Sequence, residues 1–249
     1  GGTGRVCRTP CVNDSWHVAL YGTARGLTTS PIPDGARAFQ IDFDFLDHVL
    51  VIATSDGARR QGPLKPQSVA AFYAAVMAAL ADLGINVTID DMPNEIADAI
   101  RFRDDQQHVS YDAAAAQRFW RVLASVDRVF RQFRTAFLGK CSPVHFFWGS
   151  FDLAVTRFSG RRAPPHPGGV PHLPDDVARE AYSHAVRSPG FWPGRGAIDY
   201  PAFDSSSHPA PVGFASAPAR RAAGCCQRQP GSCFLPPARL RTPPSPDPP

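Results

Sequence analysis

The chain has 249 residues, of which 43% are hydrophobic, so it is long and apolar enough to build a sizeable core. The formal net charge is +4 at pH 7, and residues 200–249 account for +3 of it through five Arg and two Asp. The first 199 residues are therefore close to neutral, which argues against the basic surface that nucleic-acid binding requires.

Membrane and secretory signals are also missing from the sequence. The most apolar window, residues 68–85, is Ala-rich, is interrupted by Asp82 and is too short to span a bilayer. No N-terminal stretch has the charged, apolar and small-residue order of a signal peptide. We therefore expect a soluble, cytoplasmic protein with neither a membrane nor a nucleic acid as partner.

The six cysteines do not predict a metal site or a disulfide scaffold. Cys7 and Cys11 are separated by three residues, and Cys225, Cys226 and Cys233 form the other cluster. Neither spacing is typical of zinc, and a disulfide framework is not expected in so long a chain without a secretory signal. Free thiols are the simpler interpretation.

The N-terminal part predicts an antiparallel meander. Residues 16–27 favour a first strand, and residues 38–45 alternate between apolar and polar side chains, as a half-buried strand does. Residues 49–54 favour the next strand. The Asp-Gly pair at 56–57 indicates a hairpin, so residues 58–64 should return along it.

The apolar period then changes to that of helices. A helix is predicted over 68–83, with Ser68 as N-cap and Gly84 just past its end. Residues 85–89 favour a short strand. A second helix is predicted over 112–138, starting after Ser110 or Asp112 and ending before Gly139.

Residues 143–159 predict a third, buried helix. Ser142 is a possible cap, Pro143 suits the first helical position and Gly160 the end. Apolar side chains would cover most of its circumference, which is typical of a buried helix. One narrow stripe would be polar, formed by His145, Gly149, Asp152, Thr156 and Ser159.

After Gly160 the chain reads as a loop rich in Pro and Gly. Twelve of the last 49 residues are Pro, so a poorly ordered tail is predicted over 200–249. The resulting fold class is α+β: an antiparallel β-meander packed with three main helices. Residues 1–199 would form a single domain.

Two stretches support a family resemblance: LYGTARGLTTSPIPDGARAFQIDFDFLDHVLVIATSDG and KCSPVHFFWGSFDLAVTRFSGRRAPPHPGGVP. They resemble an uncharacterised bacterial family, "domain of unknown function 5996", over roughly residues 12–200, and the resemblance continues more weakly through residues 201–243. The resemblance implies an intracellular protein without an assigned activity. Because the family's first and last helical segments are not recognisable here, we expect a truncated or diverging member.

The polar stripe and the loop after it form the first candidate site. His145 and Asp152 would act as catalytic acid–base groups, since imidazole titrates near neutral pH. An anionic small molecule could be bound by the side chains of Trp148, Arg157, Arg161, Arg162 and His184. Alternatively, the stripe is a buried network that fixes packing, in a non-catalytic structural or partner-binding module.

Three weaker candidates remain open. His166, His172 and His184, with Glu180, are a possible metal set, although their spacing suits no helix or strand, and we predict no metal site. Asp42 and Asp44 would share one strand face, at a spacing that carboxylate pairs use. Residues 23–35 could line a pocket mouth.

The sequence identifies no cofactor, reaction or oligomeric state, and leaves open whether the protein is an enzyme.

Overall fold

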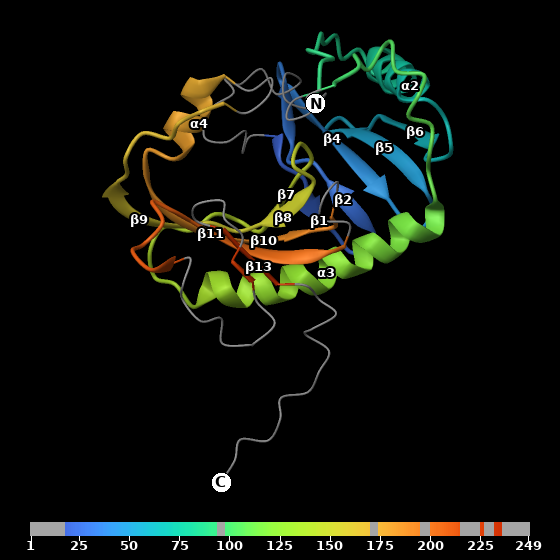
Figure 1. Cartoon of the computed structure of the whole chain (residues 1–249). Helices are drawn as coiled ribbons and strands as arrows, with labels where there is room; N and C mark the ends of the chain where they lie inside the picture. The colour runs from blue at the N-terminus through green and yellow to red at the C-terminus, as the bar shows by residue number, and fades with distance from the viewer. Residues whose placement is uncertain are drawn as a thin grey trace. The chain divides into compact units, whose positions relative to one another are not determined.

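The structure is a computed structural model that describes residues 18–93, 98–169, 174–194 and 200–214, with the backbone of 225–226 and 232–235 (Figure 1). The chain divides into two compact units, which are described separately. Unit 1 comprises Gly1–Arg128, His145–Ser150 and Pro167–Ala181, and unit 2 comprises Val129–Val144, Phe151–His166 and Tyr182–Pro249. The predicted single domain 1–199 is therefore divided at several points of the chain. One lies between Arg128 and Val129, within a helix, and two others lie at the ends of residues 145–150.

Unit 1 contains a six-stranded antiparallel sheet with the order β1-β2-β4-β5-β6, in which β3 also pairs with β4. Its strands are β1 (Tyr21–Gly22), β2 (Gly26–Thr28), β3 (Ile32–Asp34), β4 (Arg37–Asp44), β5 (Val49–Thr54) and β6 (Arg59–Pro63). The predicted β4–β5–β6 meander is confirmed, and its last hairpin turns at Gly57, where φ is +93°.

The single strand predicted over 16–27 is wrong, because the chain turns between β1 and β2. The hydroxyl of Thr23 accepts hydrogen bonds from the backbone N–H groups of Arg25 (3.2 Å) and Gly26 (3.0 Å). This local hydrogen bonding by a Thr side chain competes with continued strand structure. Gly26 is required at the turn, because a Cβ atom there would lie 1.8 Å from the carbonyl oxygen of Phe43.

Helix α2 (Val69–Asp82) has the caps that the sequence predicts. Ser68 Oγ accepts from the N–H of Ala71 at 3.1 Å, and Gly84 has a φ of +72°. The other early N–H groups are satisfied from further along the chain: Val69 donates to the carbonyl of His108, and Ala70 to that of Asp105. Leu80 and Leu83 pack with Phe39, Ile41 and Ile52 of the sheet in one core.

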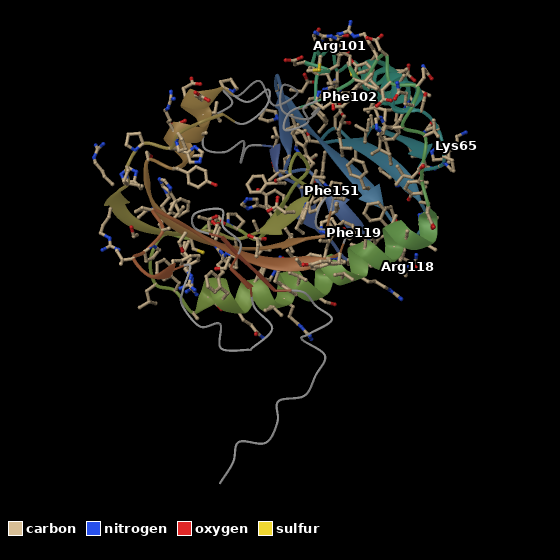
Figure 2. All side chains as sticks on the ribbon, in the orientation of Figure 1. Lys65, Arg101, Phe102, Arg118, Phe119 and Phe151 are labelled. Atoms are coloured by element: carbon tan, nitrogen blue, oxygen red, sulfur yellow. The ribbon has the colours of Figure 1, made fainter. Side chains whose placement is uncertain are left out.

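The connection from α2 to α3 is held by a buried carboxylate rather than by a strand. Residues 85–89 form no strand, although Ile85 and Ile89 are buried in the core. Asp91 is completely buried and accepts hydrogen bonds from the guanidinium groups of Arg101 (2.8 Å) and Arg103. The bond from Arg103 lowers the pKa of the Asp91 carboxyl group well below its usual range, against the effect of burial. Figure 2 labels Arg101 and its neighbour Phe102, which packs against the core.

Helix α3 (Ala113–Thr135) matches the predicted second helix, and Asp112 Oδ1 caps it by accepting from the N–H of Ala115 at 2.9 Å. In unit 1 its residue Phe119 lies edge-to-face with Phe146, with 6.2 Å between ring centroids. In unit 2 its residue Phe130 is buried against Phe203. The exposed Val122 and Val129 lie outside both contacts.

The predicted helix over 143–159 is wrong, since the segment forms strands β7 (His145–Phe147), β8 (Asp152–Ala154) and β9 (Arg157–Arg162). Residues 148–151 form a turn between the first two, and Phe151 adopts a φ of +63° there. A short apolar run with aromatic and β-branched residues suits a buried strand as well as a buried helix, so periodicity alone cannot separate the two. The polar stripe therefore does not exist as one helix face.

The sheet of unit 2 has the order β12-β13-β11-β10-β8, with β9 also pairing with β10. Its later strands are β10 (His184–Trp192), β11 (Ala202–His208), β12 (Cys225–Cys226) and β13 (Ser232–Leu235). Strand β11 lies in the segment for which the sequence predicts a poorly ordered tail, and most of the remainder of that segment is outside the described residues.

Within the described ranges the third helix is α4 (Asp175–Ala181), in unit 1. Together with the two antiparallel sheets, these helices confirm the α+β class. Among the described residues, no helix is both long and apolar enough to cross a membrane.

Candidate functional site

His145 and Trp148, two of the predicted site residues, belong to unit 1. The His145 side chain is only 2% exposed, and its ring lies edge-on to those of Phe147 (4.4 Å) and Tyr21 (6.5 Å). The indole N–H of Trp148 donates to the carbonyl of Val18 at 2.9 Å. His145 thus contributes to aromatic packing in unit 1, and Trp148 is held by a hydrogen bond to the backbone.

Asp152, the other predicted catalytic residue, lies in unit 2 at the start of β8. The register pairs Gly190 of β10 with Ala154 on one side and with Asp204 of β11 on the other. Because side chains alternate along a strand, Asp152 and Ala154 share a sheet face with Gly190 and Asp204. The structure thus places Asp152 with a carboxyl group that the sequence analysis did not select.

The side chain of Asp204 extends over Gly190 of the neighbouring strand. An added Cβ atom at Gly190 would lie 2.4 Å from Asp204 Oδ1 and 3.0 Å from both Cγ and Oδ2. Burial raises the pKa of the Asp204 carboxyl group, and the negative charge of Asp152 raises it further, to about 7. At neutral pH the two carboxyl groups therefore carry less than two negative charges.

Hydroxyl groups continue this face along the strands. Thr156 Oγ1 and Ser188 Oγ are 2.7 Å apart, and Ser206 Oγ donates to the carbonyl of Ser188 at 3.3 Å. Ser206 and Ser188 are directly opposite each other in the β10–β11 register. We call Asp152, Thr156, Ser188, Asp204 and Ser206 the polar face.

On the other face of the same strands, aromatic and aliphatic side chains form a cluster that includes Phe130 of α3. Phe191 and Phe203 are paired across β10 and β11 with 5.1 Å between ring centroids, and Phe203 also contacts Phe130. Leu153 is 2% exposed and pairs with Phe191. This packing holds strands β8, β10 and β11 in place through the face opposite to the polar face. The backbone that carries the carboxyl groups of the polar face is thereby fixed.

The predicted ligand-binding arginines have two different environments. The guanidinium carbon of Arg157 is 3.4 Å from the ring centroid of Phe133 and 5.0 Å from that of Phe137, and Arg157 Nη2 donates to the Phe133 carbonyl. Arg161 and Arg162 are exposed near the end of β9. His184 is directly opposite Arg162 on β10, and its Nδ1 is 3.1 Å from Ser183 Oγ.

The carboxylates of β4 are occupied by neighbouring groups. Asp42 accepts hydrogen bonds from Thr28 and from Gln40 (2.8 Å). Burial opposes ionisation of Asp44, but hydrogen bonds from Arg25 and from the backbone N–H groups of Asp47 and Leu46 lower the pKa of its carboxyl group. These contacts are those of a surface network, and they also account for Arg25 of the 23–35 segment.

The suggested metal set is only partly within the described residues, because His172 lies outside them. His166 stacks on Tyr182 at 4.8 Å and lies 5.8 Å from the ring of His208. Within the described ranges no group of three or more His, Cys, Asp or Glu side chains is arranged to hold a metal ion.

Asp204, Ser188 and Ser206 were missed by the sequence analysis. The strand signal of the sequence is weak here: in AFDSSSH, residues 202–208, polar residues fall on both faces of the strand, and Ala202 and Phe203 are the apolar ones. The high Pro content of the surrounding segment favoured the prediction of a poorly ordered tail. Asp152 was selected, but with His145 rather than Asp204 as its partner.

Comparison with known proteins gives a family and no activity. The model of a family described as "Family of unknown function (DUF5996)" matches residues 2–248. The chain belongs to this family. The match confirms the predicted resemblance over residues 12–200 and its weaker continuation after residue 200, and it covers the strands of both units. Neither curated proteins nor solved structures include a significant match.

Proposed function

We propose that the polar face binds a small polar molecule and that Asp204 and Asp152 act on it as an acid–base pair. In this proposal Asp204 donates a proton and Asp152, as the carboxylate, accepts one. The observation that supports it is the pairing of two carboxyl groups on one sheet face, with the pKa of Asp204 raised to about 7. Groups whose environments separate their pKa values are suited to opposite roles in proton transfer.

A comparison within the chain favours a functional pair over a structural one. Asp91 is a buried carboxylate with two arginine partners, and its pKa is lowered, as in a stabilising ion pair. For Asp204, the shift comes from burial and from the like charge of Asp152, both of which destabilise its carboxylate. Ionisation of Asp204 therefore costs the fold stability, and a carboxyl group in such an environment is suited to proton transfer.

The residues around Asp152 and Asp204 favour binding of an uncharged or cationic ligand. Ala154 and Ala202 are small, and Trp192, which pairs with Ala202, is on the same face by alternation. The hydroxyl groups of Thr156 and Ser188 can donate to or accept from a polar ligand. Two carboxyl groups would repel an anion, so the proposed ligand carries hydroxyl or amino groups.

Thermal-shift screening of sugars, polyols and amines at pH 7 tests this proposal. We expect a stabilising compound for the parent protein whose effect is lost in both Asp152→Asn and Asp204→Asn. Asp176→Asn, at an exposed position of α4, is the control for removal of one carboxylate. A compound whose effect is the same in all four proteins would place the binding site elsewhere. Failure of every compound would leave the structural or partner-binding module as the better description.

The second candidate function is binding of an anion at the end of β9. Arg162 is directly opposite His184, and Arg161 is adjacent and exposed, so three groups that can be cationic lie close together. Like charges opposite each other on a sheet are destabilising unless an anion lies between them. Calorimetric titration with inorganic phosphate tests this candidate: Arg162→Ala should weaken binding, and Arg118→Ala, on the exposed surface of α3 (Figure 2), should not.

A further inference from the structure

Gly190 stands out among the strand glycines because a single side chain occupies the space in front of it. The three atoms nearest to an added Cβ atom are Oδ1, Cγ and Oδ2 of Asp204, at 2.4, 3.0 and 3.0 Å. No backbone atom is among these three. By contrast, nothing lies within 4 Å of the corresponding position at Gly62 of β6.

We propose that Gly190 is a positioning residue, whose missing side chain allows the carboxyl group of Asp204 to extend over β10 on the side of Asp152. The inference takes its functional meaning from the acid–base site proposed above. Its geometry is independent of that function, because it concerns where one carboxyl group lies. Gly190 touches no ligand in this proposal, and acts only through Asp204.

The register supports this role. Strand β10 separates β11 from β8, and Asp152 is two residues away along β8 from Ala154, which is directly across from Asp204, so the Cα atoms of Asp204 and Asp152 are about 12 Å apart. A carboxyl group that extends over β10 shortens this separation, and a methyl group at residue 190 would block that path. Alanine is otherwise compatible with the position, since Gly190 is not among the glycines with positive φ.

Among the described residues of the neighbouring strands, few groups can change the titration of Asp204. On the polar face of β8 the ionisable residue is Asp152, and on that face of β10 Gly190 and Ser188 carry no charge. Arg187 of β10 points to the opposite face by alternation. On the other side, Asp204 pairs with Phe234 of β13, which is not ionisable.

The test is the pH titration of the Asp204 carboxyl carbon, followed by NMR in the parent, Gly190→Ala and Gly62→Ala proteins. We expect Gly190→Ala to lower the pKa of Asp204 by about one pH unit or more, because the carboxyl group moves away from Asp152 and toward water. The Gly62→Ala control, also within a strand, should titrate like the parent. An unchanged titration of Asp204 in a folded Gly190→Ala protein would overturn the inference.

A double substitution keeps the inference testable if Gly190→Ala folds poorly. Because the nearest atoms all belong to Asp204, Asp204→Ala should remove the cost of Gly190→Ala almost completely. If Gly190→Ala is equally destabilising in the parent and in the Asp204→Ala background, the side chain of Asp204 is not what Gly190 accommodates, and the inference fails. Ligand screening tests the proposed function separately, so positioning by Gly190 can hold even if no ligand is found.

Discussion

The guanidinium carbon of Arg157 lies 3.4 Å from the ring centroid of Phe133, and Arg157 Nη2 donates to the backbone carbonyl of the same residue. Phe133 is in the last turn of α3, where backbone carbonyls lack helical partners. Arg157 therefore serves as a cation at a helix C-terminus, a favourable place for positive charge. This relationship explains Arg157 without a ligand.

Replacing Arg157 should accordingly reduce stability. We expect Arg157→Ala to lower the free energy of unfolding by about 2 kcal/mol, through loss of the cation–π contact and of the hydrogen bond to the helix end. Urea denaturation measures the change. Arg161→Ala, at an exposed position of the same strand, should stay within about 0.5 kcal/mol of the parent. Equal effects of the two substitutions would contradict the structural role of Arg157.

The stability of the protein should fall as the pH rises from about 4 to about 7, because of Asp204. Its pKa is about 7 in the folded protein and 3.8 for an ordinary aspartate, so the native state binds the extra proton in this window. The contribution is present below pH 4 and is lost as the pH passes through 7. About three pH units at about 1.4 kcal/mol each set an upper limit of about 4 kcal/mol.

Asp204→Asn separates this contribution from that of other groups. The variant keeps a similar shape without the carboxylate, so it should gain stability relative to the parent between pH 5 and pH 8. Denaturation at several pH values measures the difference, with Asp176→Asn as the exposed control. A difference that stays constant with pH would show that Asp204 titrates normally.

Asp91 should contribute stability with the opposite pH dependence. Its pKa is lowered in the folded state, so its contribution is present above pH 4 and is lost as the pH falls further. We expect Asp91→Asn to cost on the order of 2 kcal/mol at pH 7, since it weakens two charge-assisted hydrogen bonds. The cost should shrink in acid. Asp104→Asn, an exposed neighbour in the same connection, should change little, and an equal loss there would contradict the prediction.

Phe151 should be replaceable by glycine with a gain in stability. Its φ of +63° lies in the left-handed region, which a bulky side chain adopts at a cost of about 1 kcal/mol, and the residue is 49% exposed. We expect Phe151→Gly (Figure 2) to raise the free energy of unfolding by up to about 1 kcal/mol. Leu46→Gly, at a similarly exposed residue, should lower it. A loss at Phe151 would mean that the contacts of its ring outweigh the backbone strain.

The sequence predicted those elements whose signals are local. Helix α2 has both of its caps within the chain segment that forms it, and residues 39–44 of β4 alternate strictly between apolar and polar side chains. Residues 143–159 lacked such a signal, because their apolar side chains fit both a helix and buried strands. The partner that decides for strands β8 and β9 is β10, which comes more than twenty residues later in the sequence.

The candidate site was predicted only in part, because its two carboxyl groups come from strands that are distant in the sequence. Asp152 could be selected because it is a carboxylate in an apolar run, but its neighbour Asp204 is determined by the strand register. No spacing rule connects residues on β8 and β11, which are separated by β10. Arg157 was assigned to a ligand because the sequence could not show that the aromatic rings of α3 lie beside it.

The start of helix α2 depends on a segment that follows it by more than thirty residues. The carbonyls of Asp105 and His108 accept from Ala70 and Val69, and Asp91 holds the same connection through Arg101 and Arg103. The first turn of the helix and the connection should therefore open together, as one cooperative unit in native-state hydrogen exchange. In acid, protonation of Asp91 should speed exchange of the Val69 and Ala70 amides while the β4–β5 ladder stays protected.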